Sequence, residues 1–265
     1  MIPLIKSILM TLIIGSLFGD RPYVVVLGIA QDGGAPHAGC EKSCCIELWE
    51  SGKKEKVSSI GIVNPLTKQS WLFDATPDFP SQYRILTEKH NTELVGIFLT
   101  HAHMGHYTGL LHLGREVMGK KNVPVYAMSR MKRFLETNGP WSQLVTLKNI
   151  NLKLIENNKD IKIGDQLFIE PFLVPHRDEY SETVGYRIIG KEKSLAFIPD
   201  IDKWEKWHGS IFQLALNTDI LLLDGTFYSQ NEIPHRNMAE IPHPFIIESM
   251  ETLSELNSEN RSKIH

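Results

Sequence analysis

The sequence has few cysteines, no excess of basic residues, and no long apolar segment after its first 19 residues. Of its 265 residues three are Cys, and 28 Lys and Arg stand against 31 Asp and Glu, a net charge of −3. The cysteines are too few for a disulfide-based scaffold, and the charge argues against general nucleic-acid binding. Hydrophobic residues make up 42% of the chain, so a disordered chain is also excluded.

Residues 1–19 contain an apolar run that is too short to anchor a chain stably across a bilayer. The run follows a single Lys6 and precedes the first acidic residue, Asp20. This pattern predicts a secretory signal peptide at 1–19 and a single domain at 20–265. Cleavage would give an exported protein, periplasmic or extracellular. Without cleavage the chain would be membrane-anchored by its N-terminus or cytoplasmic. No stable membrane span is expected after removal of the leader.

The three cysteines lie close together in the segment HAGCEKSCC. Adjacent Cys44 and Cys45 are geometrically poor partners for each other, so a disulfide would join Cys40 to one of them and leave one thiol free. The alternative is an additional structural zinc held by Cys40, Cys44 and Cys45, completed by His37 or by a residue from elsewhere in the chain. The spacing is compatible with zinc, with a disulfide and with a surface thiol cluster.

Apolar, β-branched runs alternate with helical patterns along the rest of the chain, as expected for a single α/β domain. Strands are predicted at 22–30, 58–65, 70–75, 93–101, 123–128, 161–176, 183–190, 194–200 and 219–225. Helices are predicted at 79–90, 108–119, 129–144, 203–216 and 244–257.

Several of the predicted strands end in a residue that can bind a metal ion. These residues are Asp74, His101, His176, Asp200 and Asp224. In layered α/β proteins, ligands and catalytic groups collect at the edge of the sheet where strands pass into loops. The five strand ends therefore predict one shared site.

The strongest motif is HAHMGH, which follows an apolar strand directly. It places His101, His103 and His106 in one turn. Imidazole is the commonest neutral nitrogen ligand of zinc, and a tight turn after a buried strand can direct several imidazoles inward. The motif predicts a metal centre that takes further ligands from elsewhere in the chain.

HAHMGH resembles the H-x-H-x-D-H signature of the metallo-β-lactamase-fold hydrolases. Further segments resemble that family's motifs in the same order: Asp74 in LFDAT, His176 in VPH, Asp200 in FIPD and His243 in IPHP. The resemblance covers roughly residues 23 to 250 and implies a four-layer αββα sandwich. Within the family, the QDGG loop followed by cysteines, DATPDF, HRDEYSETVGYRI and LLLDGTFY resemble the pyrroloquinoline-quinone biosynthesis B proteins.

The resemblance implies two metal seats that share one carboxylate. The ligands of the first would be His101, His103, His176 and the bridging Asp200, and those of the second would be His106, Asp200 and His243. Asp74 would orient the histidine loop from behind. Zinc is the expected metal, as one or two ions, with iron or manganese as alternatives. Two such cations activate water as a nucleophile and polarise the bond under attack, a reaction that would use Asp200 and His243.

Gly105 departs from the family pattern, which has Asp at this position. The missing carboxylate leaves the second seat more positive and weaker. Either that seat is empty or selective for an available metal, or another carboxylate replaces the missing one, and Asp78 and Asp224 are the candidates because both follow strand ends. If the seat lacks a carboxylate, Gly105→Asp is expected to raise the metal stoichiometry.

Three functions are compatible with these motifs. The first is a metal-dependent hydrolase that cleaves an ester, amide or phosphodiester bond in a small, anionic substrate. The second is a non-haem iron oxidoreductase related to quinone-cofactor biosynthesis, because two histidines and a carboxylate also suit iron. The third is a non-catalytic metal-holding carrier protein whose hydrolytic competence was lost with the Asp at position 105.

Overall fold

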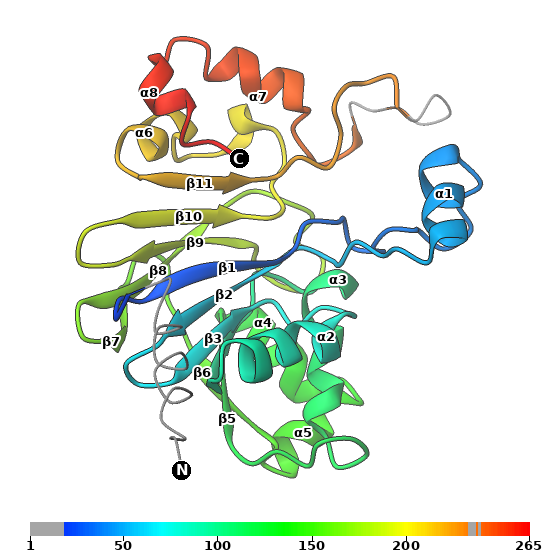
Figure 1. Ribbon diagram of the computed structural model, residues 1–265, viewed down its shortest axis with the longest axis vertical. Helices are drawn as coiled ribbons and strands as arrows, with labels where there is room; N and C mark the ends of the chain where they lie inside the picture. Colours follow the sequence, from blue (N-terminus) through cyan, green and yellow to red (C-terminus); the bar gives the residue numbers. More distant parts are fainter. Residues whose placement is uncertain (1–18, 233–236, 238–239) are drawn as a thin grey trace, which may run out of the picture.

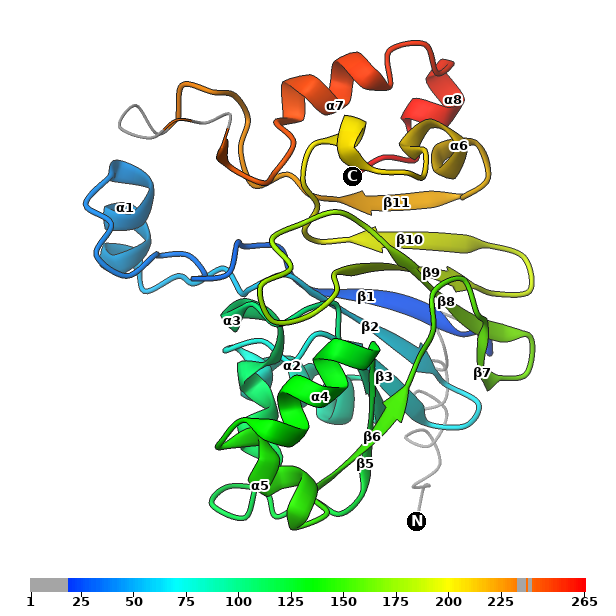
Figure 2. The same ribbon diagram turned by 180° about the vertical axis from the view of Figure 1, so that it is seen from behind.

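Two mixed β-sheets pack face to face and carry helices on their outer faces (Figures 1 and 2). The computed structural model describes residues 19–232, 237 and 240–265, so the predicted signal peptide at 1–19 lies outside the described residues except for Gly19. The four layers follow the order helices, sheet, sheet, helices, which confirms the predicted αββα sandwich. None of the helices in the described ranges is both long enough and apolar enough to cross a membrane.

The first sheet has six strands in sequence order and the second has five in the order β11-β10-β9-β8-β7. The strands of the first sheet are β1 (Tyr23–Gly28), β2 (Ser59–Asn64), β3 (Gln69–Phe73), β4 (Glu93–Phe98), β5 (Val123–Ala127) and β6 (Ile150–Leu154). Those of the second are β7 (Ile161–Gly164), β8 (Leu167–Leu173), β9 (Val184–Ile189), β10 (Ser194–Ile198) and β11 (Ile220–Leu223).

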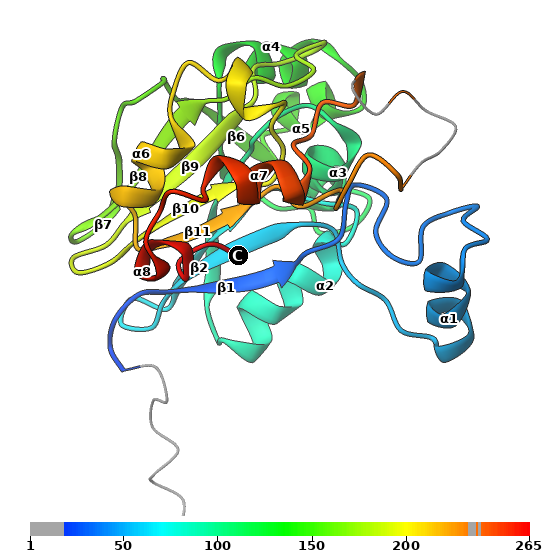
Figure 3. The ribbon, with the colours of Figure 1, turned by 90° about the horizontal axis from the view of Figure 1, so that it is seen from above.

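Helices α2 to α5 cover the first sheet, and α6 to α8 cover the second (Figure 1). Their bounds are α1 (Ser43–Ser51), α2 (Phe79–Arg84), α3 (Met104–Tyr107), α4 (Ser129–Thr137), α5 (Trp141–Thr146), α6 (Ile211–Leu216), α7 (Ile246–Thr252) and α8 (Ser258–Arg261). A π-helical turn, Ile85–Lys89, continues α2, and 3-10 turns occupy Thr108–Leu113 and Trp204–Lys206. Helix α1 stands apart from both sheets when the molecule is seen from above (Figure 3).

Alternation along each strand divides the apolar residues among three core clusters. In β2, Ile60 and Ile62 belong to the cluster between the sheets, whereas Val63 faces the helices of the first sheet. In β10, Phe197 faces the first sheet and Ile198 packs against the outer helices of the second. Strands buried on both faces carry near-continuous apolar runs, which is why their sequences lack polar alternation.

Strand direction brings the predicted metal-binding residues to one edge. β3 and β4 are parallel, and β1 runs in the same direction because β2 pairs antiparallel with both β1 and β3. In the second sheet, β8, β10 and β11 share one direction for the same reason. The loops that follow these six strands therefore meet at the carboxyl-terminal edge of the sandwich.

Several elements differ from those predicted. The strand expected at 161–176 is a hairpin of β7 and β8, and the helix expected at 108–119 is a 3-10 turn at Thr108–Leu113. The helix expected at 203–216 divides into the 3-10 turn Trp204–Lys206 and α6. The segment 129–144 was expected to form one helix, but it divides into α4 and α5 at Gly139 and Pro140, as a proline within a helical pattern favours. Strand β6 and helix α1 were not predicted. β6 alternates as Ile-Asn-Leu-Lys-Leu at the edge of its sheet, so its apolar signal is weak.

A buried hydroxyl at the centre of the sandwich gives a test of this packing. Tyr186 is fully buried between the sheets and donates to the carbonyl oxygen of Leu99, 2.5 Å away. Tyr186→Phe leaves that carbonyl without its donor, so the free energy of unfolding should fall by about 1–3 kcal/mol. Urea unfolding measures the loss, with Tyr228→Phe as control because Tyr228 is 59% exposed. Equal stability of the two variants would contradict the packing.

Candidate metal centre

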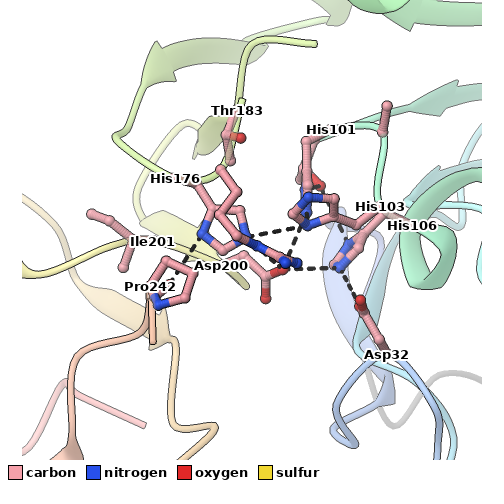
Figure 4. A network of polar contacts seen from close by, with 12 residues as sticks. Asp32, His101, His103, His106, His176, Thr183, Asp200, Ile201 and Pro242 are labelled. Atoms are coloured by element: carbon pink, nitrogen blue, oxygen red, sulfur yellow. Dashed lines mark hydrogen bonds and ion pairs between the residues drawn. The ribbon is translucent and has the colours of Figure 1, made fainter. Parts of the chain in front are cut away.

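Four of the predicted ligands meet in one group: His101, His103, His176 and Asp200 (Figure 4). His103 Nδ1 lies 2.9 Å from His101 Nε2 and 3.2 Å from His176 Nε2. Asp200 Oδ2 lies 3.1 Å from His101 Nε2. Ligand atoms held at ~2.1 Å around a tetrahedral zinc ion stand roughly 3.4 Å apart, so these spacings are close to those around one shared cation.

The other ring nitrogen of each of these histidines is held by an outer partner. The outer contacts are His101 Nδ1 to Thr100 Oγ1 at 2.9 Å, His103 Nε2 to Glu179 Oε2 at 3.1 Å, and His176 Nδ1 to the Pro242 carbonyl oxygen at 3.1 Å. A carboxylate and a carbonyl only accept, and the Thr100 hydroxyl gives its proton to Asp74 Oδ2, so the proton in each outer contact belongs to the imidazole. This leaves the inner nitrogens as lone-pair donors, the arrangement that outer partners create at metal sites.

A second group consists of His106, Asp200 and Asp32, and Asp32 was not among the predicted ligands. His106 Nε2 lies 2.8 Å from Asp32 Oδ1 and 3.3 Å from Asp200 Oδ2. Asp32 lies in the QDGG loop after β1, whose carboxyl end is at the same edge as the other ligands. The direction of β1 was the signal that could have identified it, although Asp32 stands four residues beyond the strand end.

His243 belongs to a third group, with Asp200 and Asp224. Its Nδ1 lies 2.6 Å from Asp224 Oδ2, and its ring centre is 5.2 Å from that of His176. Asp224 accepts from His243 and from the hydroxyl of Thr226, so it orients the histidine from outside the centre. This contact occupies the Asp224 carboxylate, and Asp224 shares no ligand group with His106 among the described residues.

Asp74 supports the histidine loop from behind. It adopts φ = 65°, a left-handed conformation that Asp tolerates better than most residues. Its two carboxylate oxygens accept the Thr100 N–H and O–H, each at 2.8 Å, and Oδ2 accepts His106 Nδ1–H at 2.7 Å. The turn that carries the three histidines is thus fixed to the end of β3.

Asp78 does not replace the carboxylate missing at position 105. Its Oδ2 accepts the backbone N–H of Val57 at 3.0 Å, and its Oδ1 lies 2.5 Å from Nζ of Lys54. Asp78 belongs to none of the ligand groups found among the described residues. The structure thus does not bring Asp78 to the histidine centre, because a strand-end position fixes the edge of the sheet but not the partner that a side chain meets.

Burial and neighbouring charges shift the pKa values of the histidines in different directions. Burial lowers the pKa of His101 to about 3 and that of His176 to about 4, so both rings are neutral at pH 7, the form that binds a metal. Burial acts in the same direction on His106, but the charges of Asp74 and Asp200 raise its pKa well above the ordinary value. The carboxylates therefore favour positive charge around His106.

The donor set fits divalent cations. Imidazole nitrogens and carboxylate oxygens are the ligands of zinc, and together they also suit manganese and iron. His106 Nε2 is buried and makes no hydrogen bond despite the two carboxylates near it. Buried polar atoms are normally satisfied, so this nitrogen is suited to coordinate an ion. Asp200 lies against both histidine groups, as a bridging ligand requires.

A cavity of about 510 Å³ opens beside the centre. Its polar lining includes Asp32, His106 and Asp200, and the edges of β1 and β11 contribute apolar residues such as Ile29 and Leu222. Its size is in the range of small-molecule sites. A second cavity of about 500 Å³, near His112 and Pro140, is lined by none of the predicted ligands.

The three cysteines form a separate group at the start of α1, with Cys40 on the loop before the helix and Cys44 and Cys45 in its first turn. The sulfur atoms of Cys40, Cys44 and Cys45 lie within 4.8 Å of one another, and all three are free thiols. The backbone N–H of His37 donates to Cys45 Sγ at 3.3 Å, but its imidazole is outside the group, with Nδ1 3.1 Å from the Ala38 carbonyl oxygen. His37 therefore contacts the cluster through its backbone, and its imidazole, one of the fourth ligands that the sequence allowed, is not among the grouped ligand atoms.

Comparison with known proteins places this site in a family. The model of the beta-lactamase superfamily domain matches residues 70–265, most of the chain. The chain belongs to the beta-lactamase superfamily. The match includes every predicted ligand of the histidine centre, and the likeness to pyrroloquinoline-quinone biosynthesis B proteins is also confirmed.

Two curated proteins to which the chain is similar are coenzyme PQQ synthesis proteins B. That of Methylococcus capsulatus is 25% identical over 274 residues, covering 91% of this chain and 88% of the relative. That of Nitrosococcus oceani is 24% identical over 244 residues, covering 81% and 77%.

Solved structures share the superfamily fold. Zn²⁺-bound PqqB from Methylobacterium extorquens superposes with a TM-score of 0.72 at 22% identity, covering 88% of this chain and 85% of that one. A diphosphatase of the PhnP family gives 0.63 at 21% identity over 89% and 82% of the two chains. The short form of human tRNase Z gives 0.56 at 15% over 87% of each.

Loss of a single ligand should weaken metal binding at the histidine centre. His103→Ala and Asp200→Ala should each weaken metal binding by more than ~100-fold, because even the loss of an outer hydrogen-bond partner costs 10–100-fold. Elemental analysis and calorimetric titration of metal-depleted protein measure the effect. His208→Ala is the control, since His208 is exposed and belongs to none of the ligand groups among the described residues. Unchanged metal content in the two ligand variants would disprove the centre.

Metal binding by the three thiols can be tested separately from binding at the histidine centre. If they hold a structural zinc, Cys44→Ser with Cys45→Ser should remove one equivalent of zinc and leave binding at the histidine centre intact. Cobalt(II) separates the two sites, because thiolate ligands add near-ultraviolet charge-transfer bands that imidazole and carboxylate do not. A wild-type protein without those bands would show that the thiols hold no metal.

Proposed function

We propose that the protein is a metal-dependent hydrolase that activates water at a two-metal centre to cleave an ester, amide or phosphodiester bond in a small, anionic substrate. The observation that carries the proposal is the orientation of the histidines around Asp200. Each of His101, His103 and His176 has its outer nitrogen held and its inner nitrogen free to bind, and His106 shares this arrangement.

Different residues of the chain would have different roles in such a reaction. Divalent cations bound here would lower the pKa of a coordinated water and polarise the bond under attack. Asp200, 3.1 Å from His101 Nε2 and 3.3 Å from His106 Nε2, would hold the two seats at a fixed separation. His243 is oriented by Asp224 and shares a ligand group with Asp200, so it would contact the substrate or complete the second seat.

The surroundings support a small substrate. The cavity of about 510 Å³ reaches the carboxylates of the second group directly, so a bound molecule would meet the metals and the apolar edges of β1 and β11 together. Two divalent cations outweigh the carboxylates that face them, so an anionic group would be attracted. The likeness to zinc-bound PqqB and to a PhnP-family diphosphatase supports zinc and hydrolysis.

A second candidate function is oxidation at non-haem iron. The first group contains histidines and one carboxylate, a donor set that iron enzymes also use, and the chain is similar to coenzyme PQQ synthesis proteins B. Hydrolysis is preferred because the second group, with Asp32 and His106, adds a seat next to the first, as two-metal hydrolysis requires.

Hydrolysis of chromogenic substrates tests the proposal. Metal-depleted protein should be inactive towards aryl esters and bis-aryl phosphodiesters, and zinc or manganese should restore turnover. His243→Ala should lower kcat/KM by roughly 100-fold, in the range of losing a positioned acid–base group. His208→Ala should retain full activity.

Oxygen uptake measured in parallel separates the two candidate functions. Iron-dependent oxygen consumption without hydrolysis under any metal would replace this proposal with the oxidative one. Stable metal binding without either activity would indicate a carrier.

A further inference from the structure

Space beside Gly105 is filled by a carboxylate from a different loop. A Cβ atom added to Gly105 would lie 2.2 Å from Asp32 Oδ1 and 2.7 Å from both Cα and Cγ of Asp32. No real Cβ tolerates such distances, so the two residues exclude each other's side chains. The position where the family carries its motif carboxylate thus lies against the Asp32 side chain.

The Asp32 carboxylate also lies beside the two other residues of its ligand group, His106 and Asp200. Its Oδ1 lies 2.8 Å from His106 Nε2, and together with Asp200 the three residues form one ligand group (Figure 4). His106 is 2% exposed, and its Nε2 makes no hydrogen bond although Oδ1 is so near. The oxygen therefore lies off the direction of the ring N–H. Asp32 Oδ1 and His106 Nε2 can each offer an electron pair to a metal ion. Placed side by side in this way, the two atoms suit a shared cation better than a shared proton.

Backbone contacts hold the loop that carries Asp32. The Ala30 N–H donates to the Lys56 carbonyl at 2.8 Å, and the Ser58 N–H donates to the Ala30 carbonyl at 2.8 Å. After Asp32 the chain turns through Gly34 at φ = 70°, and the Gly34 N–H donates to the Gln31 carbonyl at 2.7 Å. Asp32 is thus presented from a tight turn between two anchor points.

We propose that Asp32 is the carboxylate ligand of the second metal seat, supplied by the QDGG loop in place of a residue at position 105. The inference rests on the two-metal centre of the proposed function. Gly105 is then a requirement of the site, because any side chain there would displace Asp32. With Asp32 and Asp200 both present, two divalent ions (+4) face two carboxylates (−2), so the seat regains the charge that the glycine removes from the motif.

Metal counting on three variants tests the assignment. Asp32→Ala and Asp32→Asn should bind the second ion at least ~10-fold more weakly than wild type while keeping the first, as loss of a metal ligand implies. Asp78→Asn is the matched control, because Asp78 is a buried carboxylate beside the same loop, 4.0 Å from the position of a Cβ on Gly34. Calorimetry and cobalt(II) d–d spectra report binding without any need for turnover.

The outcomes separate the inference from the function. Retention of both ions by Asp32→Ala, or loss of the second ion in Asp78→Asn alone, would overturn the assignment even if the wild type hydrolyses substrate. Loss of the second ion in both Asp32 variants supports the assignment even if no substrate is cleaved. Asp32→Asn preserves the shape of the side chain, so it gives a result if the alanine variant does not fold.

Gly105→Asp gives an independent test in the opposite direction. If Asp32 supplies the carboxylate, the new side chain collides with it and metal stoichiometry does not rise. If the second seat lacks a carboxylate ligand, as the sequence allows, Gly105→Asp should add an ion. A gain of bound metal in this variant would overturn the assignment.

Discussion

The buried carboxylate of Asp200 is the interaction on which the centre depends. It follows β10 and meets histidines from the other sheet, with Oδ2 3.1 Å from His101 Nε2 and 3.3 Å from His106 Nε2. Burial opposes its ionisation, but His106 and His101 hold the pKa of Asp200 well below its usual range. A buried anion needs compensating positive charge, so the packing of the two sheets is compatible with a cation at this edge and costly without one.

Much of the fold followed from the sequence because its strands are buried on both faces. Ile60, Ile62 and Val63 lie in one continuous apolar run, which is typical of a strand with a core on both of its faces. β6 was missed because an edge strand alternates and exposes Lys153, so its apolar signal is short. The histidine centre was predicted from the HAHMGH motif, from the family resemblance and from strand ends that strand direction brings to one edge of the sandwich.

Asp32 was not predicted because its position depends on contacts between segments that are distant in the sequence. It lies in a turn beyond the end of β1, and its position depends on the pairing of Ala30 with Lys56 and Ser58, which local pattern does not encode. Asp78 had the better local signal, yet the Val57 N–H and Lys54 fix its carboxylate elsewhere. Sequence indicates which edge a loop reaches, whereas the contact that a side chain makes depends on long-range backbone pairing.

The loop that carries Asp32 continues directly into the cysteine cluster, which links the two groups of metal-binding side chains. Beyond the turn, Ala35 pairs with Glu55, and the His37 N–H donates to Cys45 Sγ at 3.3 Å. Cys45 is the only buried residue of α1, so this helix has almost no apolar core of its own. An ion held by the three thiolates would replace that missing core, as structural zinc does in small units. By fixing the far end of the loop, it would also restrict the Asp32 carboxylate to the neighbourhood of His106.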